Sequence, residues 1–206
     1  MTAPRLDFWF DFGSSYSYPA ACRIGALARD AGIALRWRPF LLGPIFQKQG
    51  WTTSPFNLQP AKGRYMWRDL ERVCAAMGLP LRRPTNFPRV ALLAARIGVL
   101  AADEPWLGEF VRAVFRANFA EDREIGDAAV IRDLLAGLGL PADEIVARAE
   151  TPENKLALRA RNEEAERTGL FGAPSFVTGD GELFWGNDRL ESALEWAQHH
   201  ASLEHA

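Results

Sequence analysis

Residues 6–17 read LDFWFDFGSSYS, a hydrophobic run followed by a glycine and a serine-rich segment. The run is typical of a buried strand, and the pattern after it predicts a helix that begins close to the serines. Ser14 and Ser17 have the spacing of a Cys-x-x-Cys redox motif, with a serine at each sulfur position. A helix N-terminus has unpaired amides and partial positive charge, so a hydroxyl there helps to hold an anionic sulfur from another molecule. The alternative is that Ser14 or Ser15 only caps the helix.

The composition predicts a soluble globular protein. The chain has 206 residues, of which 48% are hydrophobic, enough for one large domain or a domain with an insertion. A formal net charge of -2 gives no electrostatic attraction to nucleic acid or to an anionic membrane surface. Asp7 and Asp11 interrupt the first hydrophobic stretch, and no basic flank precedes it. We therefore expect a cytoplasmic protein with no membrane span and no nucleic-acid partner.

Cysteine and histidine usage argues against two enzyme classes. Cys22 and Cys74 lie far apart in the sequence, and we interpret both as buried small hydrophobic residues. The three histidines, His199, His200 and His205, all fall within the last eight residues. The rest of the chain therefore offers no conventional base for a Ser-His-Asp or Cys-His hydrolase and too few ligands for zinc. We expect no metal site.

The hydrophobic pattern predicts an α/β fold interrupted by helices. A strand over 6–12, a helix ending near Gly32 and a strand over 33–38 form a βαβ unit. A loop rich in Gly, Pro, Thr and Ser is expected over 42–60. Helical spacing then predicts helices over 64–77, 89–101, 106–119, 128–138, 141–149 and 152–168.

The C-terminal part returns to strands. Residues 174–178 and 182–185 flank a Gly-Asp-Gly turn and predict a hairpin, which a last helix over 188–198 follows. We therefore divide the chain into a discontinuous α/β domain, residues 1–41 and 169–199, and a loop plus helical insertion, residues 42–168. Residues 200–206 form a tail in which Leu203-Glu204-His205 resembles the start of a purification-tag scar.

Separated motifs carry a family resemblance. They are DFGSSYSY at 11–18, FGAP at 171–174 and WGNDRL at 185–190, with PAKGRYM at 60–66 as a fourth. With the helical block between them, the chain resembles the DsbA-like branch of the thioredoxin superfamily over nearly its whole length, up to about residue 198. More narrowly, it resembles 2-hydroxychromene-2-carboxylate isomerases and kappa-class glutathione transferases, and PAKGRYM is closer to the kappa-class pattern. The resemblance implies a thioredoxin-like domain interrupted by an all-helical insertion, glutathione as cofactor, a small aromatic substrate and a homodimer.

The resemblance also implies a glutathione site. Ser14 would stabilise the glutathione thiolate by donating its hydroxyl proton, and would not itself attack the substrate. A cis bond before Pro174 would turn the Ala173 backbone towards the extended glutathione, although the local residues alone fit the start of an edge strand equally well. The other glutathione-binding residues implied are Lys62, Trp185, Gly186, Asn187 and Asp188.

The alternatives for these residues are ordinary structural roles. Asp188 would pair with the ammonium of the γ-glutamyl end and Lys62 with the glycine carboxylate. Asn187 and Asp188 are also good helix caps, and Lys62 reads equally as a solvated charge. One position departs from the family, because Ser15 stands where a proline usually follows the first serine. We assign the sulfur contact to Ser14, which directly follows the strand segment and precedes Ser17 by three residues.

Substrate-binding residues are predicted in the loop and the helical block. The resemblance points to Lys48, Asn57, Leu58 and Asn86, with Lys48 as the candidate for the substrate carboxylate; solvated loop residues are the alternative. An aromatic wall for a flat substrate, or simply core packing, is predicted from Trp51, Phe56, Tyr65, Trp67 and Phe87. Asp11 is expected to be a buried hydrogen-bonding group.

The sequence leads to one predicted function and two alternatives. We predict a glutathione-dependent isomerase of a conjugated aromatic carboxylic acid, of the type that converts 2-hydroxychromene-2-carboxylate to trans-o-hydroxybenzylidenepyruvate. The first alternative is a kappa-class-like glutathione transferase. The second is a non-catalytic thiol- or peptide-binding protein of the thioredoxin fold. A disulfide oxidoreductase is excluded at this site, because neither Ser14 nor Ser17 can form a disulfide.

Overall fold

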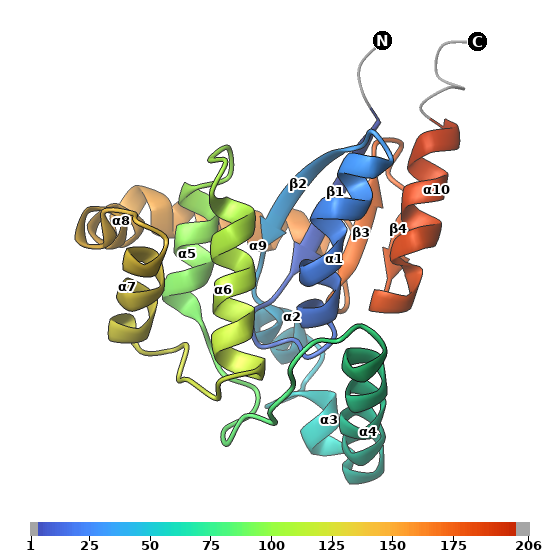
Figure 1. Ribbon diagram of the computed structural model, residues 1–206, viewed down its shortest axis with the longest axis horizontal. Helices are drawn as coiled ribbons and strands as arrows, with labels where there is room; N and C mark the ends of the chain where they lie inside the picture. Colours follow the sequence, from blue (N-terminus) through green and yellow to red (C-terminus); the bar gives the residue numbers. More distant parts are fainter. Residues whose placement is uncertain (1–3, 201–206) are drawn as a thin grey trace.

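The structure is a computed structural model that describes residues 4–200, and its centre is a four-stranded sheet of order β2-β1-β3-β4 (Figure 1). The strands are β1 (Arg5–Phe10), β2 (Ala34–Pro39), β3 (Ser175–Thr178) and β4 (Leu183–Trp185). β1 is parallel to β2 and antiparallel to β3, which pairs antiparallel with β4. The helix α1 (Ser17–Asp30) joins β1 to β2, so the predicted βαβ unit and hairpin are confirmed.

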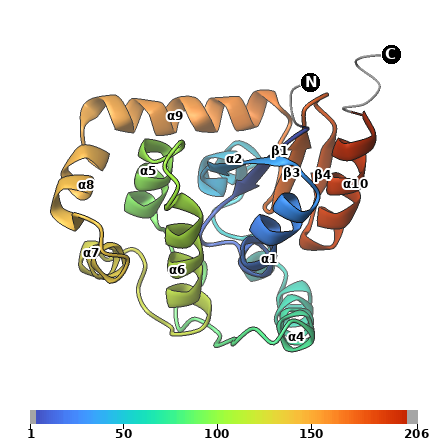
Figure 2. The ribbon, with the colours of Figure 1, turned by 45° about the horizontal axis from the view of Figure 1, so that its top comes forward.

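The segment between β2 and β3 is helical. Its helices are α2 (Leu42–Lys48), α3 (Pro55–Leu58), α4 (Pro60–Ala76), α5 (Leu92–Leu100), α6 (Leu107–Phe119), α7 (Ala128–Gly137), α8 (Ala142–Ala149) and α9 (Pro152–Arg167). After β4, the short 3-10 helix η1 (Asn187–Arg189) leads into α10 (Leu190–His200). Figure 2 shows α5 to α8 grouped laterally beside the strands and α10 at the opposite end, next to β4. No helix within residues 4–200 is long and apolar enough to cross a membrane.

Alternating side chains of β1 pack in two hydrophobic cores. Phe8 and Phe10 belong to the larger core, to which α1, α6 and α10 contribute. Trp9 belongs to a second core with Ile45 of α2 and Ala165 of α9. Successive strand side chains point to opposite faces, so α1 and α10 cover one face of the sheet while α2 and α9 cover the other.

The structure corrects several predicted boundaries. The expected loop over 42–60 contains α2 and α3, and the helix predicted from residue 64 begins at Pro60, a proline at the first helical position. The helix predicted from residue 89 begins at Leu92, because Arg89 is buried and its guanidinium is held by carboxylates outside the helix. The first strand ends at Phe10 instead of residue 12.

The turn after β1 is built by Asp11. Its carboxylate accepts hydrogen bonds from the amides of Gly13 and Leu42, each at 2.7 Å, and so draws the chain away from the strand direction. A Cβ atom added at Gly13 would lie 2.6 Å from the carbonyl oxygen of Arg89, so only glycine allows that segment to pack on the turn. The turn lies at the end of β1 that faces α3 and α4 (Figure 1).

Arg89 connects this turn to the helical insertion. Its guanidinium lies 2.6 Å from Asp122 and 3.1 Å from Glu124 and donates to the Asn118 side-chain oxygen at 3.1 Å. The Asn118 amide in turn donates to the carbonyl oxygen of Phe12 at 3.0 Å. This chain of polar contacts is buried at Arg89 and Asn118, and it fixes the end of β1 against the segment before α5.

Candidate thiol-binding site

Ser14 faces the loop that enters β3. Its hydroxyl donates a hydrogen bond to the carbonyl oxygen of Ala173 at 2.8 Å, while its amide donates to the Asp11 carbonyl oxygen at 2.9 Å. The first residue of α1 is Ser17, and the preceding Tyr16 makes no side-chain cap. The alternative that Ser14 only caps the helix is therefore not what the structure shows. Ser14 is partly exposed, whereas Ser15 is 2% exposed.

The loop that Ser14 contacts contains the predicted cis proline. The Ala173-Pro174 peptide bond is cis, which confirms the prediction. The Pro174 carbonyl oxygen accepts a hydrogen bond from the Gly186 amide at 2.9 Å. Two motifs that lie far from Ser14 in sequence, FGAP and WGND, therefore meet beside the start of α1.

The WGND residues form the edge of this site. The Trp185 side chain is 53% exposed and contacts the Phe171 ring, with centroids 4.9 Å apart. Gly186 has a φ of 112°, which glycine adopts without strain. Asn187 is buried, and its side-chain oxygen accepts a hydrogen bond from Arg23 of α1.

Asp188 and Lys62 are the charged members of the predicted glutathione set. The Asp188 side chain is 74% exposed, with its carboxylate 3.5 Å from the Arg189 guanidinium. The Lys62 ammonium lies 5.9 Å from the Phe56 ring centroid, and that ring contacts Tyr16. Lys62 is thus connected to the turn after β1 through two aromatic rings, while Asp188 follows the WGND segment directly.

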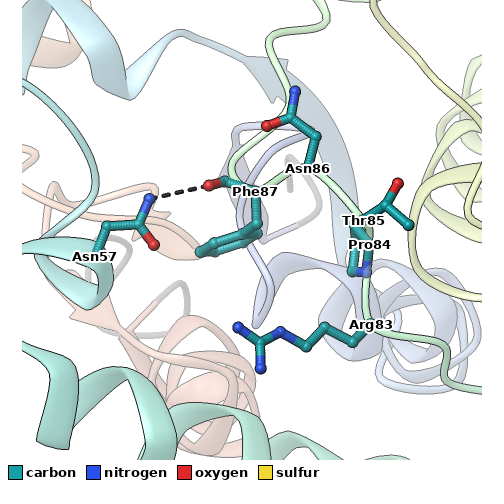
Figure 3. A pocket seen from close by; sticks show the side chains of 6 residues that line it. All are labelled: Asn57, Arg83, Pro84, Thr85, Asn86 and Phe87. Atoms are coloured by element: carbon teal, nitrogen blue, oxygen red, sulfur yellow. Dashed lines mark hydrogen bonds between the residues drawn. The ribbon is translucent and has the colours of Figure 1, made fainter.

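Two predicted substrate residues share a pocket of about 500 Å³ (Figure 3). It is lined by Asn57, Arg83, Pro84, Thr85, Asn86 and Phe87. The Asn57 amide donates to the Phe87 carbonyl oxygen at 2.9 Å, which holds α3 against the pocket wall (Figure 3). Leu58 is 45% exposed and does not line the pocket.

Lys48 is not brought to this pocket. Its ammonium lies 2.6 Å from the Glu166 carboxylate at the end of α9, and it is absent from the lining residues. The structure therefore separates the residue predicted to bind the substrate carboxylate from Asn57 and Asn86.

The aromatic residues predicted to form one wall lie in different surroundings. Trp67 and Phe87 contact each other edge to face with centroids 4.9 Å apart, and Phe87 lines the pocket. Trp51 instead contacts Phe46, and Tyr65 is 64% exposed on α4. Phe87 is therefore the member of the predicted wall that lines the pocket, and Trp67 supports it by ring contact.

Two arginines near the pocket were missed by the sequence analysis. Arg83 lines the pocket, and the buried Arg89 anchors the segment that carries it. The pair of adjacent arginines before Pro84 was the available signal for Arg83. No local pattern distinguishes Arg89, because its partners Asn118 and Asp122 lie about thirty residues away.

The two cysteines of the chain do not supply a thiolate at neutral pH. Burial raises the pKa of Cys22 to about 11, and burial raises the pKa of Cys74 to about 11 as well. Both are free thiols, and Cys22 is only partly buried, in contrast to the prediction. We therefore expect an anionic sulfur at Ser14 to come from another molecule.

Burial shifts the pKa of two other ionisable groups near the turn. Burial raises the pKa of Asp11, against the lowering effect of the amide hydrogen bonds from Leu42 and Gly13. Burial also raises the pKa of Tyr16, and its hydroxyl donates to the Asp69 carboxylate at 2.8 Å. Within residues 4–200, no group of three or more His, Cys, Asp or Glu side chains is placed to hold a metal ion.

Comparisons with known proteins identify the family of the chain. The model of the DSBA-like thioredoxin domain matches residues 5–195. A 2-hydroxychromene-2-carboxylate isomerase of Sphingobium xenophagum is 30% identical, covering 90% of this chain and 94% of its own. A glutathione S-transferase kappa 1 of Caenorhabditis elegans is 35% identical, covering 95% of this chain and 91% of its own.

A solved structure of a 2-hydroxychromene-2-carboxylate isomerase superimposes with a TM-score of 0.83 at 26% identity, covering 97% of this chain and 98% of its own. The chain therefore belongs to the DsbA-like thioredoxin family, in the branch whose members include 2-hydroxychromene-2-carboxylate isomerases and kappa-class glutathione transferases.

Proposed function

We propose that the protein is a glutathione-dependent isomerase of a conjugated aromatic carboxylic acid of the 2-hydroxychromene-2-carboxylate type. The observation that carries the proposal is the Ser14 hydroxyl, which lies three residues before the first residue of α1 and donates to the carbonyl oxygen of the residue before cis-Pro174. A donor in this position suits a sulfur anion, and the adjacent helix N-terminus favours negative charge.

The residues around Ser14 suit glutathione as the source of that sulfur. The chain's own cysteines are protonated at neutral pH, while the Asp188 carboxylate is exposed and accessible to an ammonium group. Ala173, Trp185, Gly186 and Asn187 would hold the peptide, and Lys62 would meet its terminal carboxylate. The relatives named glutathione S-transferase kappa support the same choice of thiol.

The chain contributes positioning and charge stabilisation. When bound, glutathione would supply a thiolate for reversible addition to the conjugated system, which would allow rotation about the former double bond. The Ser14 hydroxyl would exchange its hydrogen bond to the Ala173 carbonyl oxygen for one to the sulfur. This hydrogen bond stabilises the thiolate and lowers the pKa of the bound thiol. The substrate would lie in the pocket of Asn57 and Asn86, with Phe87 in the pocket wall and Trp67 packed against Phe87. The resemblance also implies a homodimer, which remains a prediction.

Two alternatives remain as proposals, each with its own signature. A kappa-class-like transferase would leave the sulfur in its product; the 35% identity to the kappa-class relative and the PAKGRYM segment favour it. A thiol- or peptide-binding protein without catalysis would bind glutathione and turn nothing over.

Thermal melting and a thiol assay distinguish the three. Glutathione at about one hundred times its dissociation constant should stabilise the fold by roughly 2.7 kcal/mol, and S-methylglutathione should also raise the melting temperature. With 2-hydroxychromene-2-carboxylate, free thiol should stay constant while absorbance changes; falling thiol identifies a transferase. No melting shift with either ligand would contradict the proposal.

A further inference from the structure

The segment that lines the pocket of Asn57 and Asn86 leads directly to the Ser14 turn. One of its lining residues, Phe87, precedes Pro88, and the Pro88-Arg89 backbone packs on Gly13. A Cβ added at Gly13 would lie 3.5 Å from the Pro88 Cβ. The segment that lines the pocket therefore packs on the turn that carries Ser14 through its next two residues.

Arg83 is the only ionisable residue among the six that line the pocket. Its guanidinium lies 5.1 Å from the Trp67 ring centroid, and Trp67 is 8% exposed and packed against Phe87. The ring thus offers a fixed platform for the flat guanidinium. Figure 3 shows Arg83 extending beneath the Phe87 ring.

Arg83 differs from its neighbours in having no carboxylate partner. Arg82 lies 3.8 Å from Asp122, and Arg89 is paired with both Asp122 and Glu124. Among the ion pairs formed within residues 4–200, none includes Arg83. A guanidinium that is oriented by an aromatic ring and has free N–H groups is suited to bind a carboxylate with two parallel hydrogen bonds.

We propose that Arg83 binds the carboxylate of the substrate in this pocket and so determines the preference for acidic substrates. The proposal rests on the proposed function, and it assigns to Arg83 the role that the sequence suggested for Lys48, whose ammonium is paired with Glu166. A carboxylate reaching Arg83 has two sources, the aromatic substrate and the glycine end of glutathione. The test separates them.

The test uses equilibrium binding, so that it does not depend on turnover. Trans-benzylidenepyruvate and its methyl ester are titrated into the full chain in the presence of S-methylglutathione, and tryptophan fluorescence reports binding. The variants are Arg83→Met and Arg83→Lys. Arg83→Met keeps the approximate length of the side chain but removes its charge, and Arg83→Lys keeps the charge but cannot donate two parallel hydrogen bonds. Arg82→Met is the matched control, because Arg82 is the adjacent arginine and does not line the pocket.

We expect Arg83→Met to raise the dissociation constant of the acid at least tenfold and to leave that of the ester within twofold. Arg83→Lys should give an intermediate value, and Arg82→Met should behave as the wild type. Glutathione affinity should stay within twofold in every variant. If substrate turnover exists, KM for the acid should rise more than kcat falls.

Other outcomes would overturn the assignment. An equal loss of affinity for the acid and the ester would mean that the Arg83 side chain contributes packing and not charge. A loss of glutathione affinity would mean that Arg83 binds the glycine carboxylate of glutathione instead. An unchanged acid affinity in Arg83→Met, or no acid binding by the wild type, would also reject it. Acid binding that depends on Arg83 without any glutathione-dependent turnover would support this site while contradicting the proposed function.

Discussion

The hydroxyl of Ser14 donates a hydrogen bond at 2.8 Å to the carbonyl oxygen of Ala173, which lies 159 residues further along the chain. The contact joins the start of α1 to the cis-proline loop and orients the Ser14 hydroxyl towards that loop. Hydrogen bonds to ionised acceptors are stronger than those to neutral carbonyl groups, so a thiolate arriving at this position would compete for the Ser14 proton. The donor is therefore in place before a thiol binds.

Asp188→Ala should weaken glutathione binding more than it disturbs folding. The carboxylate is 74% exposed, so its pairing with the ligand ammonium should contribute about 0.5–1.5 kcal/mol, a loss of affinity of up to roughly tenfold. Calorimetric titration with glutathione measures the change. Glu195→Ala, which removes the same charge from an exposed position of α10, should leave affinity unchanged. A lower melting temperature with normal affinity would make Asp188 a helix cap only.

Gly172→Ala should displace Trp185 from the edge of the site. A Cβ at this position would lie 2.3 Å from the Trp185 indole nitrogen, so the ring must move. Because the ring is half exposed, we expect weaker glutathione binding with a melting temperature close to that of the wild type. Gly179→Ala is the control, since its added Cβ would meet nothing within 4 Å. Unchanged affinity in Gly172→Ala would remove Trp185 from the glutathione site.

The two cysteines should react slowly with thiol reagents in the native protein. With a pKa of about 11, each is ionised to roughly 0.03% at pH 7.5, compared with about 10% for an ordinary cysteine thiol. Labelling by a chromogenic disulfide should therefore be about 300-fold slower than for an ordinary cysteine, and rapid after denaturation. Fast native labelling would show that the chain supplies a thiolate of its own.

Asp122→Asn should lower the free energy of unfolding at neutral pH. In acid the same substitution should have little effect. Hydrogen bonds from the Thr85 amide and from Arg89 hold the pKa of Asp122 below its ordinary value. The carboxylate therefore stabilises the fold above the ordinary pKa of about 3.9, and the contribution disappears as pH falls through the lower folded-state pKa. Asn tolerates the φ of 56° found at this position, so backbone strain should not obscure the result.

Thermal melts at pH 7 and near pH 3 measure this difference. The difference in melting temperature between the wild type and Asp122→Asn should be clear at pH 7 and should become smaller near pH 3. Asp143→Asn serves as the control, because its side chain is 93% exposed and faces Arg132 at the surface. A difference that is independent of pH would mean that the ionised form of Asp122 is not what stabilises the pocket wall.

Local pattern predicted the parts of the fold that depend on neighbouring residues. The strand leading to Ser14, the hairpin around its Gly-Asp-Gly turn and the long helices all follow from hydrophobic spacing and turn chemistry. The short helix α3 did not, because it depends on tertiary contact: at Gly63 of α4 an added Cβ would lie 2.2 Å from the Phe56 carbonyl oxygen. Helices of this length have little stability of their own.

In the candidate site too, some residues follow from sequence motifs and others depend on tertiary contacts. Ser14 and the WGND residues lie in recognisable motifs, and the structure places them beside the cis-proline loop. Arg83 lies outside these motifs, and the adjacent arginines of the sequence do not distinguish it from Arg82. Its distinct place comes from the contact with the Trp67 ring and from the absence of a paired carboxylate within residues 4–200. The separation of Lys48 from the pocket likewise depends on Glu166, a residue of a distant helix.

The pKa of glutathione bound to the protein tests the central claim most directly. It is measured by ultraviolet thiolate absorbance against pH, with the S-methylglutathione complex as the blank. In the wild type the bound thiol should titrate below free glutathione. Ser14→Ala should raise that pKa by about one to two units, at about 1.4 kcal/mol per unit, while Ser15→Ala should change it much less. A bound-thiol pKa that is the same in Ser14→Ala as in the wild type, or a larger shift in Ser15→Ala, would contradict the account.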